Sequence, residues 1–199
     1  MEYFVIKTGL FGLTFIRNGE RVVSGTGFSR NIILVGFMGT GKSTVSRLLA
    51  ERLGWESLDT DEEIVKAADK SIPQIFADDG ETAFRDWESQ AVRQALSGER
   101  RIVATGGGAV LRESNRQQML ERGWVVALTA DKASLVRRVT SAETGTRPLL
   151  AGDAEARVTQ LLESRRHAYD FANAKVDTSD KSPEEVAEAL LRGLPDGWL

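Results

Sequence analysis

The sequence predicts a three-layer α/β fold, in which a parallel sheet is covered by helices on both faces. Short apolar segments alternate with helical patterns from residue 31 to near the end of the chain, and this alternation is typical of parallel sheets. The first apolar segment, residues 31–35, leads into a glycine-rich loop that opens a helix. The 199 residues, of which 41% are hydrophobic, are enough for one sizeable core.

The glycine-rich loop at residues 36–44 has the form G-x-x-x-x-G-K-S, which is a phosphate-binding pattern. Its glycines permit positive φ angles and let backbone N–H groups approach phosphate oxygens. Lys42 would add a charge at the outer phosphates, and Ser43 a hydroxyl for Mg²⁺. The helix that follows has an apolar stripe of Val45, Leu48, Leu49 and Leu53, and ends at Gly54. A glycine-rich turn without a ligand is the weaker alternative, because both flanks fit the motif.

Composition limits the classes of partner. The net charge is −3, so no basic excess favours nucleic acid or an anionic membrane, and an anionic ligand must be met by locally placed arginines. The chain has no cysteine, which excludes disulfides and thiol catalysis and is compatible with the cytoplasm. No stretch is long and apolar enough to span a bilayer.

Residues 1–30 differ from the rest of the chain and predict a small β-hairpin extension. Three apolar runs lie at residues 4–6, 13–16 and 21–23, around an Asn18-Gly19 pair that is typical of hairpin turns. Residues 24–27 have the composition of a linker. The apolar part lacks a small-residue cleavage site, which disfavours a secretory signal. A transit peptide and a loosely attached or untranslated leader are open alternatives.

The remaining strands are expected at residues 55–58, 102–105, 125–128 and 174–177. Ser182, Pro183 and Glu185 provide an N-cap, a first-turn proline and a capping glutamate, so the last helix begins there. Another helix is expected at residues 81–97. It carries Arg85 beside its apolar face, where an arginine is more often a snorkelling or salt-bridged residue than a ligand.

Candidate site residues follow two of these strands. Asp59 and Asp61 come at the carboxyl edge of the sheet, where open α/β folds bind ligands. We expect their side chains to point to opposite sides, one toward metal and phosphates and the other toward a second substrate. An N-cap role for Asp61 is an equally weighted alternative. Gly106, Gly107 and Gly108 follow the next strand, where they would let a ligand touch the backbone.

From about residue 31 to residue 194, about five-sixths of its length, the chain resembles shikimate kinase, a small P-loop kinase of aromatic amino-acid biosynthesis. Seven ordered motifs carry the resemblance: G-F-M-G-T-G-K-S-T, L-D-T-D, F-R-D-W-E, A-T-G-G-G-A-V, T-R-P-L-L, R-R-H-A-Y and V-D-T-S-D-K-S-P-E-E-V. The resemblance implies a five-stranded sheet of the nucleoside-monophosphate-kinase type, with strand order 2-3-1-4-5. It also implies a cytoplasmic, monomeric enzyme that transfers the ATP γ-phosphoryl group to the 3-hydroxyl of shikimate with Mg²⁺.

The resemblance also assigns roles to residues. Asp61 would orient the acceptor hydroxyl, Arg85 and Arg165 would hold the acceptor carboxylate, and the turn of Gly106, Gly107 and Gly108 would contact the acceptor. Lys42 and Arg147 would act on the phosphates, with Arg147 on a lid at residues 140–153. Asp59 would join Ser43 near Mg²⁺, through water. ATP contacts are implied at Gly39, Thr40, Gly41, Lys42, Ser43, Thr44, Arg138, Arg147 and Lys181.

Two other functions are open, and the chain departs from the family in two places. A gluconate or nucleotide kinase would use the same arginines for another anion, and a non-catalytic nucleotide-binding relative would not need the acceptor-side residues. His167 stands where relatives commonly carry proline, and we expect a structural role for it. The family's catalytic domain, expected at residues 31–199, lacks the extension of residues 1–30.

Overall fold

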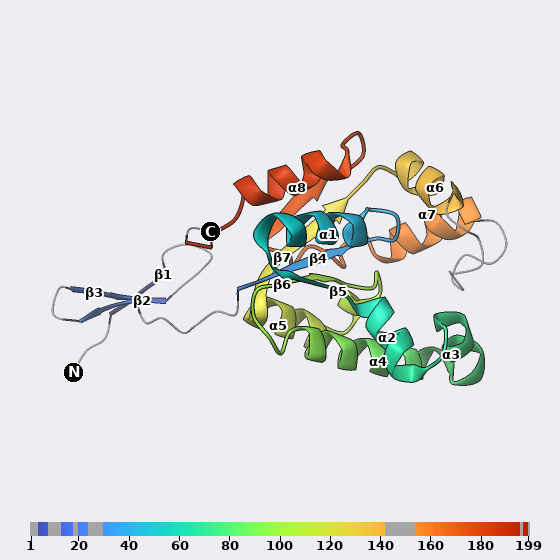
Figure 1. Ribbon diagram of the computed structural model, residues 1–199, viewed down its shortest axis with the longest axis horizontal. Helices are drawn as coiled ribbons and strands as arrows, with labels where there is room; N and C mark the ends of the chain where they lie inside the picture. The colour runs from blue at the N-terminus through green and yellow to red at the C-terminus, as the bar shows by residue number, and fades with distance from the viewer. Residues whose placement is uncertain are drawn as a thin grey trace.

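The fold is built around a five-stranded parallel sheet. The computed structural model describes residues 4–7, 13–17, 20–23, 30–141, 154–195 and 197–198. The strands are β4 (Asn31–Gly36), β5 (Glu56–Asp59), β6 (Arg101–Ala104), β7 (Gly123–Thr129) and β8 (Ala174–Asp177). Their order in the sheet is β5-β6-β4-β7-β8 (Figure 1). Counted from β4 as the first strand, this is the predicted order 2-3-1-4-5. The expected strands lie within two residues of the observed ones.

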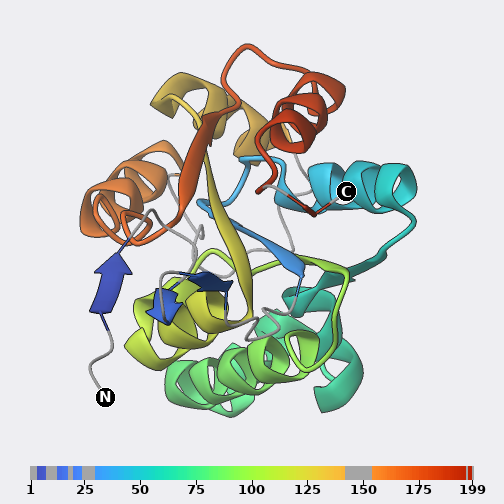
Figure 2. The same ribbon diagram turned by 90° about the vertical axis from the view of Figure 1, so that its left-hand side faces the viewer.

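Helices cover both faces of the sheet (Figures 1 and 2). One layer contains α1 (Lys42–Leu53) and α8 (Pro183–Arg192), and the other contains α4 (Gly80–Ala95), the short η1 (Ala109–Leu111) and α5 (Glu113–Arg122). In β4, Ile32 and Leu34 pack on the α1 and α8 side, whereas Ile33 and Val35 pack on the α4 side. A strand buried on both faces reads as a continuous apolar run, which explains the sequence of β4.

Two smaller groups of helices flank the carboxyl edge of the sheet. In the first, α2 (Thr60–Ala68) and α3 (Ile72–Asp78) pack on α4 around the buried side chains of Ile64, Ile75 and Phe84. In the second, α6 (Lys132–Ser141) and α7 (Ala154–Ser164) pack around Phe37 of the phosphate-binding loop. No helix in the described part of the chain is long and apolar enough to cross a membrane.

The amino-terminal segment contains the predicted hairpin within a three-stranded antiparallel sheet. Its strands are β1 (Phe4–Lys7), β2 (Leu13–Arg17) and β3 (Glu20–Val23), in the order β1-β2-β3. The predicted turn at Asn18 and Gly19 and the linker at residues 24–27 lie outside the described residues. Most of the predicted lid, residues 142–153, also lies outside them.

Asn31 holds the amino-terminal edge of the sheet together. Its side chain is fully buried. The amide nitrogen donates hydrogen bonds to the carbonyl oxygens of Gly98 and Arg122 at 2.9 and 3.1 Å, and the amide oxygen accepts one from the Arg101 N–H at 3.0 Å. One buried side chain therefore satisfies three backbone groups from segments far apart in the sequence.

We predict that Asn31→Ala lowers the free energy of unfolding by about 2–3 kcal/mol, because it leaves these backbone groups without partners. Denaturant unfolding measures the change. Gln117→Ala, at an exposed position of α5, is the control and should change stability by less than about 0.5 kcal/mol. Equal stability of the two variants would contradict a clamping role for Asn31.

Candidate functional site

The phosphate-binding loop lies at the carboxyl end of β4 and opens α1. Gly36, Gly39 and Gly41 have φ angles of +147°, +83° and +89°, which residues other than glycine rarely adopt. At Gly36 a Cβ would also lie 2.3 Å from the carbonyl oxygen of Leu128. The loop can therefore pack against β7 only with glycine at this position.

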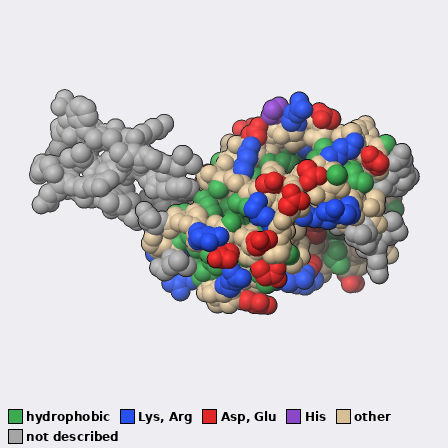
Figure 3. Space-filling view, turned by 90° about the horizontal axis from the view of Figure 1, so that it is seen from above, with side chains coloured by type: hydrophobic (Ala, Val, Ile, Leu, Met, Phe, Trp, Pro, Cys, Tyr) green, Lys and Arg blue, Asp and Glu red, His purple; other side chains and the backbone are tan. Residues whose placement is uncertain are grey.

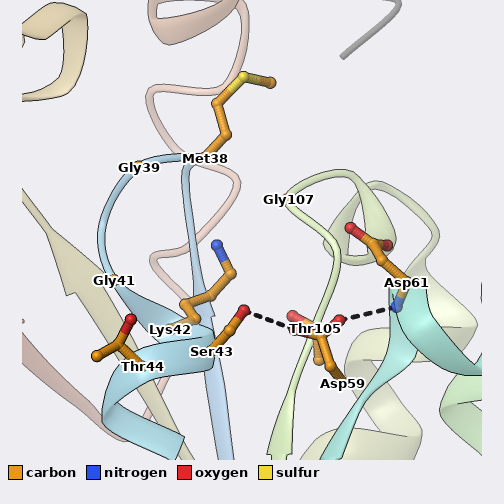
Figure 4. Close-up of a pocket in the computed structure, with 10 residues that line it drawn as sticks. All are labelled: Met38, Gly39, Gly41, Lys42, Ser43, Thr44, Asp59, Asp61, Thr105 and Gly107. Atoms are coloured by element: carbon orange, nitrogen blue, oxygen red, sulfur yellow. Dashed lines mark hydrogen bonds between the residues drawn. The ribbon is translucent and has the colours of Figure 1, made fainter. Parts of the chain in front are cut away.

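A cavity of about 280 Å³ opens beside this loop (Figure 4). It is lined by Met38, Gly39, Gly41, Lys42, Ser43, Thr44, Asp59, Asp61, Thr105 and Gly107. The Lys42 ammonium donates hydrogen bonds to the carbonyl oxygens of Gly36 and Phe37, at 2.9 and 3.0 Å. This positive charge and the amino-terminal end of α1 make the cavity suitable for phosphate groups.

Asp59 connects the loop to the second strand–helix junction. Its Oδ2 accepts a hydrogen bond from the Ser43 hydroxyl at 2.6 Å, and its Oδ1 accepts one from the Asp61 N–H at 3.0 Å (Figure 4). Asp59 is therefore the N-cap of α2, the role that the sequence analysis considered for Asp61. The Ser43 hydroxyl and the Asp59 carboxylate are oxygen ligands of the kind that Mg²⁺ prefers.

The expectation that Asp59 and Asp61 point to opposite sides is wrong. Both side chains line the same cavity. The chain is not extended across this pair, because α2 begins at Thr60. Residues two apart on a strand would in any case share a face. The two carboxylates nevertheless have different surroundings. Asp59 accepts two hydrogen bonds, whereas Oδ1 of Asp61 accepts none from the described residues.

Asp61 is the carboxylate with an unsatisfied atom. Its Oδ1 is buried and accepts no hydrogen bond from any residue that the structure describes. The pKa of Asp61 is raised to about 7, mainly by burial and also by the charges of Asp59 and Glu88, against the lowering effects of Lys42 and Arg85. A hydroxyl group that entered the cavity and donated to Oδ1 would satisfy this atom.

The glycine turn after β6 fits between the site's charged side chains. A Cβ on Gly106 would lie 2.5 Å from Asp61 Oδ1, and one on Gly108 would lie 2.2 Å from an Arg85 nitrogen. The Gly106 N–H donates to the buried Thr60 hydroxyl at 2.9 Å, which fixes the turn to the start of α2. Larger residues at these positions would displace the side chains that define the cavity.

Arg85 and Arg165 both lie beside this turn, Arg85 near Gly108 and Arg165 near Gly107. Arg85, on α4, forms ion pairs with Glu88 and with Glu81. Glu88 is 2% exposed, and its burial raises its pKa despite the arginines nearby. Arg165 is 5% exposed and donates weakly to the Gly107 carbonyl oxygen at 3.4 Å. Two largely enclosed guanidinium groups next to a glycine turn form a suitable site for a carboxylate.

A second cavity, of about 230 Å³, shares Gly39, Gly41 and Thr44 with the first. Arg138 and Lys181 line it, and so do Thr178, Pro183 and Val186. Arg138 donates to the carbonyl oxygens of Thr178 and Ser179 at 2.6 and 3.1 Å, and Lys181 donates to that of Asp177 at 2.8 Å. Because the two cavities meet at the phosphate-binding loop, one elongated ligand could occupy both.

The structure brings together most of the expected site residues, with Arg147 outside the described residues. Glu88 and Tyr169 were missed in the sequence analysis, although both stand in motifs quoted there. His167 lies at the surface, where its ring contacts Asp170 at 2.8 Å. On the face seen in Figure 3, basic and acidic side chains are interspersed, whereas Arg85 and Arg165 are largely enclosed.

Comparison with known proteins identifies the family. A family model described as shikimate kinase matches residues 38–195. The chain belongs to the shikimate kinase family. A shikimate kinase of Pelotomaculum thermopropionicum is 43% identical over 168 residues, which cover 84% of this chain and 96% of that one. A shikimate kinase of Streptomyces coelicolor is 47% identical over 161 residues, covering 80% and 92%.

Solved structures of shikimate kinases have the same fold. The shikimate kinase of Acinetobacter baumannii in complex with shikimate superposes with a TM-score of 0.78 at 36% identity, covering 82% of this chain and 91% of that one. The Aquifex aeolicus shikimate kinase gives a TM-score of 0.69 at 35% identity, covering 82% and 94%. A gluconokinase of Sinorhizobium meliloti, with 19% identity and a TM-score of 0.53, shares the fold alone.

The raised pKa of Asp61 predicts a pH-dependent cost to stability. The folded protein holds a proton on Asp61 up to about pH 7, whereas the unfolded chain releases it near the ordinary value of 3.8. Stability contributed by this group therefore falls as the pH rises from about 4 to 7. Asp61→Asn should raise the free energy of unfolding at pH 8, by on the order of 1–3 kcal/mol.

Denaturant unfolding at pH 5 and pH 8 measures this effect, and the difference between Asp61→Asn and wild type should shrink at the lower pH. Asp180→Asn, at an exposed position, is the control and should leave stability nearly unchanged at both values. A destabilised Asp61→Asn protein at pH 8 would show that the fold favours the ionised carboxylate.

Proposed function

We propose that this chain transfers the γ-phosphoryl group of ATP to the 3-hydroxyl of shikimate, giving shikimate 3-phosphate for aromatic amino-acid biosynthesis. The observation that carries the proposal is the buried Oδ1 of Asp61, which has no hydrogen-bond partner among the described residues and lies in one cavity with Lys42 and Gly107. That cavity offers an acceptor for a hydroxyl proton on one side and a positive charge for phosphates on the other. The membership of the shikimate kinase family supports the same assignment.

ATP would lie along the two cavities that meet at the phosphate-binding loop. Its phosphates would follow residues 39–44, with Lys42 nearest the outer phosphates, and its base would enter the cavity lined by Arg138 and Lys181. Arg147 is proposed to approach the phosphates from the lid. Phosphoryl transfer depends mainly on in-line positioning and neutralisation of charge, which this arrangement supplies.

Mg²⁺ is proposed to bind next to Ser43 and Asp59, whose oxygens are 2.6 Å apart. The described residues contain no group of three or more His, Cys, Asp or Glu side chains that could hold a metal. Mg²⁺ usually binds through few protein ligands, with phosphate oxygens and water completing its shell, so the two oxygens here fit it. The ion would neutralise charge on the phosphates.

The acceptor would be held at its carboxylate and its hydroxyl. Arg85 and Arg165 would bind the carboxylate together with the backbone of Gly106, Gly107 and Gly108. Asp61 would then accept a hydrogen bond from the reacting hydroxyl and take its proton as the phosphoryl group transfers.

Because a carboxylate must be ionised to do this, turnover should rise with pH through the range in which Asp61 loses its proton.

A coupled assay of ADP release across several acceptors tests the function. Shikimate should give turnover well above that of quinate, gluconate and nucleoside monophosphates. Preference for gluconate or a nucleotide would assign the arginines to another anion, and no acceptor-dependent turnover would indicate a nucleotide-binding protein. A cytoplasmic, monomeric enzyme without a nucleic-acid or membrane partner is part of the same proposal.

We predict that Arg165→Ala weakens shikimate binding by about 2–4 kcal/mol, because a bound carboxylate would lose its charged partner in a buried site. ATP binding should be nearly unchanged. The neighbouring Arg166 is 68% exposed, so Arg166→Ala is a matched control that should leave both affinities intact. Calorimetry with each ligand measures the effect, and equal loss of ATP and shikimate affinity would place Arg165 outside the acceptor site.

We also propose that residues 1–30 form an extension separate from the catalytic domain, which begins at residue 31. Deleting residues 1–28 should leave turnover within about twofold of the full chain, because separate domains make few contacts across their boundary. Steady-state kinetics and thermal melting of the two proteins measure this. An inactive or strongly destabilised truncation would show that the extension is integral to the catalytic domain.

A further inference from the structure

The turn of Gly106, Gly107 and Gly108 is fixed by contacts to the carbonyl oxygen of Gly107. The Tyr169 hydroxyl donates a hydrogen bond to this oxygen at 2.9 Å, and Arg165 reaches the same oxygen at 3.4 Å. Tyr169 and Gly107 are 62 residues apart in the sequence. The carbonyl group is thus bonded to the segment that follows α7.

Tyr169 itself is fixed by its own segment. Its ring packs against the buried cluster between the sheet and α4. A few residues later, Asn173 exchanges two hydrogen bonds with the backbone of Val125 in β7, at 2.8 and 2.9 Å. The hydroxyl of Tyr169 therefore approaches the glycine turn from a segment that is attached to the central sheet.

This contact determines how the turn faces the cavity. The carbonyl group of Gly107 and the N–H of Gly108 belong to one planar trans peptide unit, so they point in opposite directions. Holding the carbonyl oxygen against Tyr169 and Arg165 turns the Gly108 N–H away from them. Gly107 itself lines the cavity with Asp61 and Lys42. No residue in the described part of the chain accepts a hydrogen bond from the Gly107 N–H, so this donor can serve a ligand.

We propose that Tyr169 is a positioning residue for the acceptor carboxylate, because its hydroxyl holds the Gly107 carbonyl oxygen in the place where Arg165 also contacts it. The proposal rests on the function proposed above. Tyr169 does not touch the acceptor in this account. It acts by keeping the glycine turn and the Arg165 guanidinium in place before the acceptor arrives, so that acceptor binding does not have to order them.

Tyr169→Phe tests the proposal, because it keeps the packed ring and removes the hydroxyl alone. The KM for shikimate should rise about 3–10-fold, the effect of one net hydrogen bond, while kcat, the KM for ATP and the melting temperature stay near wild-type values. Ser164→Ala is a matched control. It removes a hydroxyl that bonds to the Leu161 carbonyl oxygen instead of the glycine turn, and it should leave all four quantities unchanged.

An acceptor analogue separates positioning from a general structural role. Binding of shikimate and of its neutral carboxamide is compared by calorimetry for wild type and Tyr169→Phe. The variant should lose affinity for shikimate and lose much less for the carboxamide, because the hydroxyl acts through the carboxylate site. The same loss for both ligands, or an unchanged KM for shikimate, would overturn the proposal. A wild-type enzyme that fails to phosphorylate shikimate would instead overturn the proposed function.

Discussion

The two hydrogen bonds of the Asp59 carboxylate join the phosphate-binding loop to the start of α2, where Asp61 lies. One oxygen binds the Ser43 hydroxyl of the phosphate-binding loop, and the other caps α2 through the Asp61 N–H. The register of β5, β6 and β4 places these groups at one edge of the sheet, because Asp59 lies opposite Ala104 and Ala104 lies opposite Leu34. The phosphate-binding loop and the Asp61 carboxylate are thereby fixed relative to each other.

The same edge contains an oxygen atom that lacks a partner among the described residues, beside several enclosed charged groups. Asp61 has a buried oxygen without a described partner, and its anion is disfavoured by burial. Arg85 and Arg165 are largely enclosed, and Glu88 is the buried carboxylate between them. Such groups lower stability and are retained where a ligand completes them. In the proposed complex, the acceptor hydroxyl would supply the partner that the Asp61 oxygen lacks among the described residues.

Sequence reasoning reached the features that depend on local spacing. The phosphate-binding loop is readable because its glycines, Lys42 and Ser43 lie within one loop, and the capping box at Ser182 and Glu185 is equally local. The strand order was predicted from the resemblance to a family, since no residue pattern in β5 or β8 indicates which strand lies next to it in the sheet. The orientation of Asp59 and Asp61 was misjudged because residues two apart on an extended chain share a face, and because α2 already begins at Thr60. Glu88 and Tyr169 were missed because their significance lies in contacts across the fold, such as Tyr169 with Gly107.

Titration of the Asp61 carboxyl group tests the account most directly. Carbon-13 NMR of the labelled carboxyl, with Asp61→Asn used to assign the signal, would give its pKa with and without shikimate. Without shikimate the pKa should be about 7, and it should fall when the acceptor hydroxyl donates to the carboxylate, because that bond favours the charged form. A pKa near the ordinary 3.8, or one that shikimate leaves unchanged, would contradict the role of Asp61 as the group that receives the acceptor hydroxyl.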